Sequence, residues 1–224
     1  CAVLPIDAAL HPESVEAAIV GPLDQEMPVL GQKGFGAWCG AVRLETSGVG
    51  HLADAMISIE LNHFAPPLRL VNLMADARSV RSYGCASRAL ALVAAGAIDA
   101  HLDIRGRLTA ESYLAGARLV IEAGGCVAGL DGGKLPAAHD LTDGIGLIAA
   151  ASRALCDEIV ERLAMTEADG RTATPEVALI LAAGLGSRLS RNSNVPKPLT
   201  KALGLSLGER VVCTLHEAVN IRHF

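Results

Sequence analysis

The chain has 224 residues, of which 51% are hydrophobic and 3% aromatic, and its formal net charge is -5. This length allows one or two domains with a substantial core. The mild negative charge excludes a general nucleic-acid surface, and no apolar run reaches the roughly 18 residues of a membrane span. We therefore expect a cytoplasmic α/β protein that binds no nucleic acid.

The first part of the chain predicts a succession of strands. Residues 1–10 and 15–20 fit two strands separated by a His-Pro-Glu-Ser turn. A glycine-rich turn over residues 32–38 leads into another strand. Residues 55–61 alternate between apolar and polar side chains, as a further half-buried strand does.

From residue 84 onward, predicted helices and strands alternate, which is typical of layered α/β packing. Gly96, and Gly124 with Gly125, follow two of the helices and can form their C-terminal caps. The predicted helices cover residues 84–95, 109–123 and 152–163, and the predicted strands cover residues 97–104, 126–130 and 146–150.

A polar stretch divides the chain. Residues 166–176 are rich in Thr, Glu and Asp and contain Gly170 and Pro175, so they predict a linker between a domain at 1–165 and a second unit at 177–224. The second unit predicts one strand, a glycine turn and a helix over about 206–219. Because the chain begins with Cys1 and stops soon after this helix, we expect both domains to be truncated.

The second unit contains the motif Leu181-Ala182-Ala183-Gly184-Leu185-Gly186-Ser187-Arg188, followed by Pro196-Lys197-Pro198-Leu199. A glycine turn after a strand directs backbone N–H groups at phosphate oxygens. Arg188 and Lys197 would add positive charge for a polyphosphate. The motif resembles the opening of the nucleotidyltransferases that make nucleotide-activated sugars and polyols.

This resemblance implies the first β-loop-α unit of a Rossmann-like domain. The activity implied is transfer of a nucleotidyl group from a nucleoside triphosphate, with Mg²⁺, to a phosphorylated sugar or polyol, for example from CTP to inositol phosphate. By resemblance, the catalytic residues are Arg188 and Lys197. The implied nucleotide-binding residues are Leu181, Ala182, Ala183, Gly184, Leu185, Gly186, Ser187, Arg188 and Lys197.

A second set of motifs occurs in order along the first domain. These segments resemble the C-terminal two-thirds of the inositol monophosphatase family over about residues 1–163. The resemblance implies a layered α/β/α/β/α sandwich, incomplete at its N-terminus, and Mg²⁺-dependent hydrolysis of phosphate monoesters. The motifs are Gly34-Phe35-Gly36-Ala37-Trp38, Leu52-Ala53-Asp54-Ala55, Arg81-Ser82-Tyr83-Gly84-Cys85-Ala86, Val93-Ala94-Ala95-Gly96 with Asp99, Leu114-Ala115-Gly116, Glu122-Ala123-Gly124-Gly125 and Asp131-Gly132.

The family's metal ligands are not retained at the matching places. Asp7 lacks the preceding aspartate and the following Gly-Thr of the family's ligand segment, and it is interpreted as a surface carboxylate. Glu111-Ser112 stands where the family has Trp-Asp, and serine offers no anionic oxygen to Mg²⁺. We therefore predict no metal ligand in this chain. Asp103 falls where the family has a polyol-contacting acid, so it is a candidate substrate residue.

Three functions stay open at this point. The first is a fragment of a bifunctional protein, in which a sugar- or polyol-phosphate nucleotidyltransferase carries an inactive phosphatase-like domain. The second is an active Mg²⁺-dependent monoesterase in the full-length protein. The third is a non-catalytic scaffold, with the phosphatase-like domain serving for oligomerisation and a homodimer among the expected assemblies.

Overall fold

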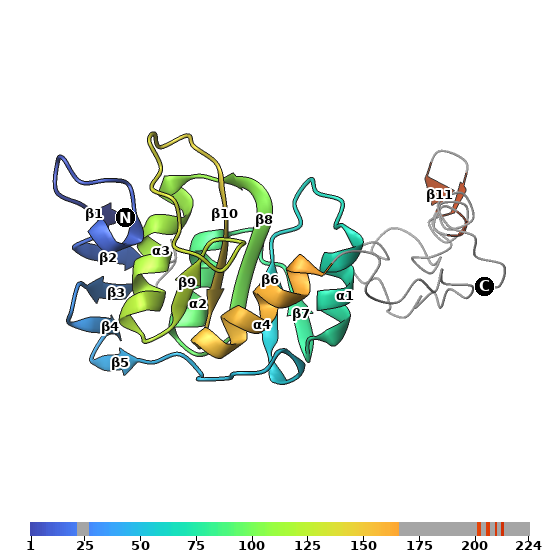
Figure 1. The fold of residues 1–224 in the computed structure, drawn as a ribbon, viewed down its shortest axis with the longest axis horizontal. Helices are drawn as coiled ribbons and strands as arrows, with labels where there is room; N and C mark the ends of the chain where they lie inside the picture. The colour runs from blue at the N-terminus through green and yellow to red at the C-terminus, as the bar shows by residue number, and fades with distance from the viewer. Residues whose placement is uncertain (22–26, 166–200, 203–204, 207–208, 210–211, 213–224) are drawn as a thin grey trace. The chain divides into compact units, whose positions relative to one another are not determined.

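The computed structural model describes residues 1–21 and 27–165, together with residues 201, 202, 205, 206, 209 and 212. The chain forms two compact units, residues 1–169 and 170–224. The elements of the first unit are drawn in Figure 1 from blue to orange.

The first unit begins with an antiparallel sheet of five strands that follow one another in chain order. The predicted strand over residues 1–10 is wrong in length, because only Ala2–Val3 pair in the ladder and Pro5 has no N–H to donate. At the turn between the third and fourth strands, Gly34 and Gly36 have φ angles of 79° and 87°. The strands are β1 (Ala2–Val3), β2 (Ala17–Val20), β3 (Val29–Gln32), β4 (Gly36–Cys39) and β5 (Val42–Leu44), with a short 3-10 helix at Pro12–Ser14.

The first unit also contains a mixed sheet of five strands, with the strand order β7-β6-β8-β10-β9. β6 runs parallel to both β7 and β8, whereas β10 is antiparallel to β8 and β9. The predicted strand over 97–104 begins later than expected and continues to Leu108. The strands are β6 (Met56–Ile59), β7 (Ser79–Arg81), β8 (Ala100–Leu108), β9 (Cys126–Ala128) and β10 (Ile145–Ala150).

Four α-helices are described, and the sequence predicts three of them. Gly96 and Gly124 follow two of these helices with φ angles of 65° and 87°, which confirms the predicted glycine caps. Ser152 caps the last helix, since its Oγ accepts a hydrogen bond from the Leu155 N–H at 3.1 Å. The first helix was not predicted. The helices are α1 (Leu68–Asp76), α2 (Ala86–Ala94), α3 (Ala110–Glu122) and α4 (Arg153–Ala164), and a second 3-10 helix covers Leu52–Asp54.

The helices fill two layers. α2 and α3 pack between the two sheets, and α1 and α4 cover the other face of the mixed sheet (Figure 1). Gly116 brings α2 and α3 close together, because a Cβ at this position would lie 2.6 Å from the Cβ of Leu90. One hydrophobic cluster, which includes the buried Tyr113 and Leu119, fills the space around α2 and α3, and a second cluster lies beneath α1 and α4.

The described layers are therefore sheet, helices, sheet and helices, one layer fewer than the predicted α/β/α/β/α sandwich. The outer face of the first sheet carries Ile19, Leu30, Trp38 and Arg43 in one row of register. Ile19 and Leu30 are 44% and 41% exposed, which is unusual for large apolar side chains side by side on a sheet. No described residue supplies a helical layer over this face.

The second unit is described over six residues. β11 (Lys201–Ala202) and β12 (Leu205–Ser206) pair antiparallel, and the sequence did not predict this pair of strands. The Glu209 N–H donates to Ser206 Oγ at 3.1 Å, and the Ser206 N–H donates to Glu209 Oε2 at 2.6 Å. This reciprocal capping box lies where the helix over about 206–219 is predicted to begin, and most of that range lies outside the described residues.

Within the described parts of the chain, no helix is both long and apolar enough to cross a membrane.

Candidate functional site

Polar side chains gather at one edge of the mixed sheet. β6, β7 and β8 are parallel, so their carboxyl ends meet at the same edge, which is where open α/β sheets place their ligand sites. Glu60 follows β6 directly, and its N–H donates to the Leu102 carbonyl at 3.0 Å. Asp103 is the next residue of β8 and therefore lies beside Glu60.

Asp103 forms a two-pronged ion pair with Arg105. Arg105 Nε donates to Asp103 Oδ1 at 3.0 Å, and Nη2 donates to Oδ2 at 2.7 Å. The side chain of Asp103 is 0% exposed and that of Arg105 is 15% exposed, so Arg105 is the partner that reaches the surface. The hydrogen bond to Asp103 raises the pKa of Arg105, which stays charged.

Two further residues complete the surroundings of the guanidinium. Arg105 Nη1 donates to the Asn62 carbonyl at 3.2 Å and lies 4.0 Å from Glu60 Oε1. Asn62 in turn lies against Gly84, where a Cβ would be 3.2 Å from Asn62 Nδ2 and where φ is 66°. The loop before α2 therefore passes close to the Arg105 cluster.

α2 begins directly after this loop. Its N-cap is Cys85, which makes no side-chain capping hydrogen bond, although its Sγ lies 3.4 Å from Ser87 Oγ. The first-turn N–H groups of a helix point at the end of the helix and favour an anion there. Arg105 thus contacts the Asn62 carbonyl, and the residue before the N-cap of α2 lies against the Asn62 side chain.

His101 also lies on β8, two residues before Asp103 and on the same face of the strand. Its ring is buried, and Nδ1 is 3.3 Å from Ser58 Oγ, while Nε2 has no hydrogen-bond partner. Burial lowers the pKa of His101 to about 4, with Asp103 opposing and Arg105 adding to the shift. The imidazole is therefore neutral at physiological pH.

The residues at the start of α3 do not form a metal site. Ser112 occupies the first turn of α3, and its Oγ is 3.4 Å from Thr109 Oγ1, while Glu111 is exposed. Among the described residues, no group of three or more His, Cys, Asp or Glu side chains converges in a way that could hold a metal ion. The carboxylates at the sheet edge are already engaged with Arg105, so the described residues do not fit Mg²⁺.

The sequence located this site only in part. Asp103 was named as a substrate residue, but the structure places its carboxylate under Arg105, away from solvent. Arg105, Glu60 and Asn62 were missed. Period-two alternation along β8 was the available signal for Arg105, since residues 103 and 105 of a strand share a face.

The predicted nucleotide-binding residues 181–188 and Lys197 lie outside the described residues, so the arrangement of Arg188 and Lys197 stays a prediction.

Comparison with known proteins supports the family resemblance of the first domain alone. The model of the inositol monophosphatase family matches residues 9–167, more than half of the chain. This match ends before the nucleotide-binding motif and gives no support to a nucleotidyltransferase unit, to a bound nucleoside triphosphate or to a homodimer.

Several individual proteins are also similar. The inositol-1-monophosphatase of Mesorhizobium japonicum is 35% identical over 109 residues, which cover 46% of this chain and 40% of that protein. Inositol monophosphatase 1 of Xenopus laevis is 29% identical over 167 residues, which cover 70% of this chain and 56% of the relative. The chain thus spans about half the length of these relatives.

Solved structures share the fold. The extragenic suppressor protein suhB from Bartonella henselae superposes with a TM-score of 0.56 and 26% identity, over 66% of this chain and 58% of that one. Inositol monophosphatase II from Staphylococcus aureus gives a TM-score of 0.60 at 23% identity, over 68% and 58% of the two chains. Because the family model matches more than half of the chain, the chain belongs to the inositol monophosphatase family.

Proposed function

We propose that the first domain recognises a phosphorylated polyol and belongs to a Mg²⁺-dependent phosphomonoesterase, the second of the three functions that the sequence left open. Family membership supports this function over the nucleotidyltransferase hypothesis. The relatives are named for hydrolysis of inositol monophosphate, and a phosphorylated polyol of this kind is the substrate class we propose.

The observation that carries the proposal is the Arg105 guanidinium at the sheet edge. Asp103 and the Asn62 carbonyl fix three of its donors, and the loop before α2 lies on the other side of Asn62. A preorganised guanidinium suits an anionic oxygen or a polyol hydroxyl. In this arrangement Arg105 contacts the substrate, and Asp103 is a positioning residue.

No hydrolytic step is assigned to the described residues, because their carboxylates do not form a Mg²⁺ site. When bound, the ions of such an enzyme would neutralise the phosphate and activate water. The contribution we assign to this chain is orientation of the polyol phosphate.

The test is calorimetric titration of the chain with inositol 1-phosphate, inositol and inorganic phosphate. Arg105→Lys keeps a positive charge beside Asp103 but loses the planar fork, so inositol 1-phosphate should bind about tenfold more weakly. Arg107→Lys is the matched control, since Arg107 is exposed two residues further along β8. Equal binding by both variants would contradict the role of Arg105.

A nucleotidyltransferase unit at 177–224 stays a prediction from the motif around Gly184 and Gly186, with Arg188 and Lys197. Its test is pyrophosphate release from CTP with inositol phosphate as acceptor. Arg188→Ala and Lys197→Ala should each remove roughly 2–4 kcal/mol of transition-state stabilisation. Turnover should fall accordingly in both variants. Unchanged turnover in both variants would exclude the assignment.

A further inference from the structure

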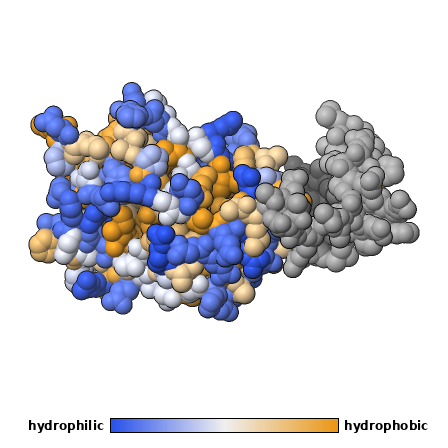
Figure 2. All heavy atoms as spheres, viewed as in Figure 1, coloured by the Kyte–Doolittle hydropathy of each residue, from blue (hydrophilic) through white to orange (hydrophobic). Residues whose placement is uncertain are grey.

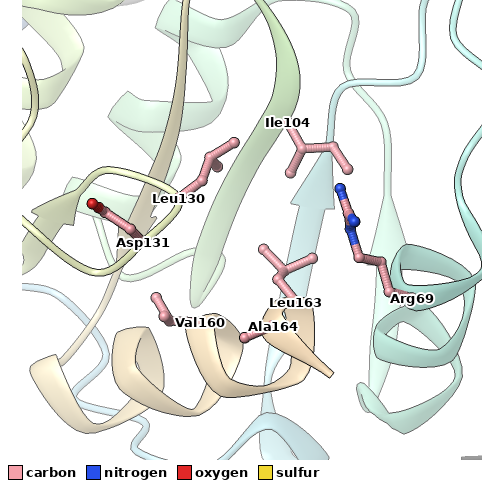
Figure 3. A pocket seen from close by; sticks show the side chains of 7 residues that line it. All are labelled: Arg69, Ile104, Leu130, Asp131, Val160, Leu163 and Ala164. Carbon is pink, nitrogen blue, oxygen red and sulfur yellow. The ribbon is translucent and has the colours of Figure 1, made fainter. Parts of the chain in front are cut away.

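A cavity of about 410 Å³ opens between α1, β8, the loop after β9 and α4. Figure 3 shows Ile104 and Leu130 on one side of it and three residues of α4 on the other, with Arg69 reaching in from α1. The lining residues are Arg69, Ile104, Leu130, Asp131, Val160, Leu163 and Ala164. A volume of this order is typical of small-molecule pockets.

This cavity is separate from the Arg105 site. Asp103 pairs with Leu147, which belongs to the cluster around α2 and α3. Ile104 is the next residue of β8 and packs against the cluster beneath α1 and α4. Because successive strand residues point to opposite faces, the two sites lie on opposite faces of the mixed sheet. An inference about the cavity is therefore independent of the proposed function.

The walls of the cavity are aliphatic. Ile104, Leu130 and Val160 are only partly buried, although each packs against the cluster beneath α1 and α4. Leu163 adds a further apolar wall and is 9% exposed. In Figure 2, apolar surface is visible where α4, β8 and α1 meet. Covering such surface is favourable by roughly 25 cal/mol per Å², so a hydrocarbon chain suits these walls.

Arg69 is the cationic group of the cavity, and no residue in the described part of the chain compensates its charge. It makes no hydrogen bond or ion pair with any residue that the structure describes, and its guanidinium points toward Ile104 (Figure 3). The acidic residue of the lining, Asp131, accepts a hydrogen bond from the Gly133 N–H at 2.9 Å, and its carboxylate points away from the aliphatic walls. The charge that would complement Arg69 is therefore negative.

We propose that this cavity binds a small amphiphilic carboxylic acid, with the carboxylate on Arg69 and the hydrocarbon chain between Leu130, Val160 and Leu163. The planar guanidinium matches a carboxylate through two parallel hydrogen bonds. A phosphate dianion fits less well, because one arginine cannot balance both of its charges and Asp131 lies on the opposite rim.

The test uses octanoate as the probe and the full chain as the protein. Saturable binding of octanoate is expected by titration calorimetry and by ligand-observed NMR. 1-Octanol has the same chain without charge, and octylammonium has the opposite charge, so both should bind at least tenfold more weakly than octanoate. Binding of either compound as tightly as octanoate, or no saturable binding of octanoate, would overturn the proposal.

Two variants locate the site. Arg69→Gln removes the charge and should weaken octanoate binding roughly ten- to hundredfold, the factor that corresponds to hydrogen bonds with a charged group. Val160→Trp fills the cavity and should abolish binding, while circular dichroism checks that the variant folds. Arg43→Gln, an exposed arginine on β5, is the matched control and should bind as wild type does. Wild-type affinity in Arg69→Gln or in Val160→Trp would overturn the assignment.

Discussion

At the scale of single residues, the Asp103–Arg105 pair decides which polar groups the edge of the mixed sheet exposes. A fully buried carboxylate is costly unless it is paired and hydrogen-bonded, and Arg105 supplies both compensations from two residues away. The two hydrogen bonds therefore hold the guanidinium in place and also satisfy the carboxylate. Loss of either partner leaves the other with an uncompensated charge in a largely desolvated position.

Arg105→Gln should lower the free energy of unfolding by roughly 3–5 kcal/mol, the range for removing one partner of a buried ion pair. Urea denaturation followed by circular dichroism measures this change. The control is Arg153→Gln, which breaks the exposed pair between Arg153 and Asp157, whose side chains are 63% and 55% exposed. It should lower the free energy of unfolding much less than Arg105→Gln does, because solvent screens an exposed pair. Equal losses in the two variants would show that the Asp103 pair is no stronger than a surface pair.

His101 gives the fold a specific pH dependence. Its pKa is about 4 in the folded chain, against an ordinary value of 6.5. Between these values the unfolded chain binds a proton that the folded chain does not, so stability falls as the pH is lowered. The loss between about pH 6.5 and pH 4.5 should be roughly 2–3 kcal/mol.

The measurement is the urea midpoint of wild type and His101→Gln from about pH 7 to about pH 4.5. The variant should lose most of this slope, because glutamine does not titrate. A slope that survives unchanged in His101→Gln would assign the pH dependence to other groups.

Residue-level chemistry was only partly visible in the sequence. The position of Asp103 was identified through a family resemblance, and its partner follows two residues later on the same strand. Asn62 lies 43 residues away from Arg105 in the chain, and only the parallel pairing of β6 with β8 brings the two together. No local pattern encodes such a contact, because it depends on strand order in the sheet.

At the scale of elements, the last residue of α3 anchors the turn between β3 and β4. Glu122 accepts hydrogen bonds from the Gly34 N–H at 2.9 Å and the Gly36 N–H at 2.7 Å, and it pairs with Arg118 one helical turn earlier. The turn's glycines have left-handed backbones and no side chains of their own to hold them. The carboxylate thus joins the first sheet to the helical layer.

Glu122→Ala should lower the free energy of unfolding by roughly 2–4 kcal/mol, because two backbone donors lose a charged acceptor. Hydrogen exchange should accelerate most at the amides of Gly34 and Gly36. Glu161→Ala removes an exposed glutamate from α4 and serves as the control, with little expected change. Unaltered protection at the two glycine amides would mean that Glu122 does not hold the turn.

Elements with strong local signals were predicted well. α3 has a period of apolar residues and a glycine at its end, and its predicted bounds differ from the observed bounds by one residue at each end. α1 was missed, since it follows two prolines and carries no capping side chain. The first strand was predicted too long, because an apolar run does not reveal how many of its residues pair with a neighbouring strand.

At the scale of the whole molecule, the first unit has its own hydrophobic core. The described members of both hydrophobic clusters all come from before residue 164, and α4 closes the second cluster with Leu155, Ile159 and Leu163. Burial of this extent is what allows a domain to fold alone. The predicted domain boundary at residue 165 follows α4 directly.

A chain truncated after residue 165 should therefore fold with the secondary structure of the first unit. Its melting temperature should lie within about 3 °C of that of the first transition in the full chain, since a change of 1 kcal/mol shifts a domain of this size by about that much. Truncation after residue 150 is the control. It removes α4 and exposes Ile148, Ala150 and their neighbours, so this shorter chain should not unfold cooperatively. If the chain of 165 residues also lacked a cooperative transition while the full chain melted sharply, residues beyond 165 would be part of the first domain's core.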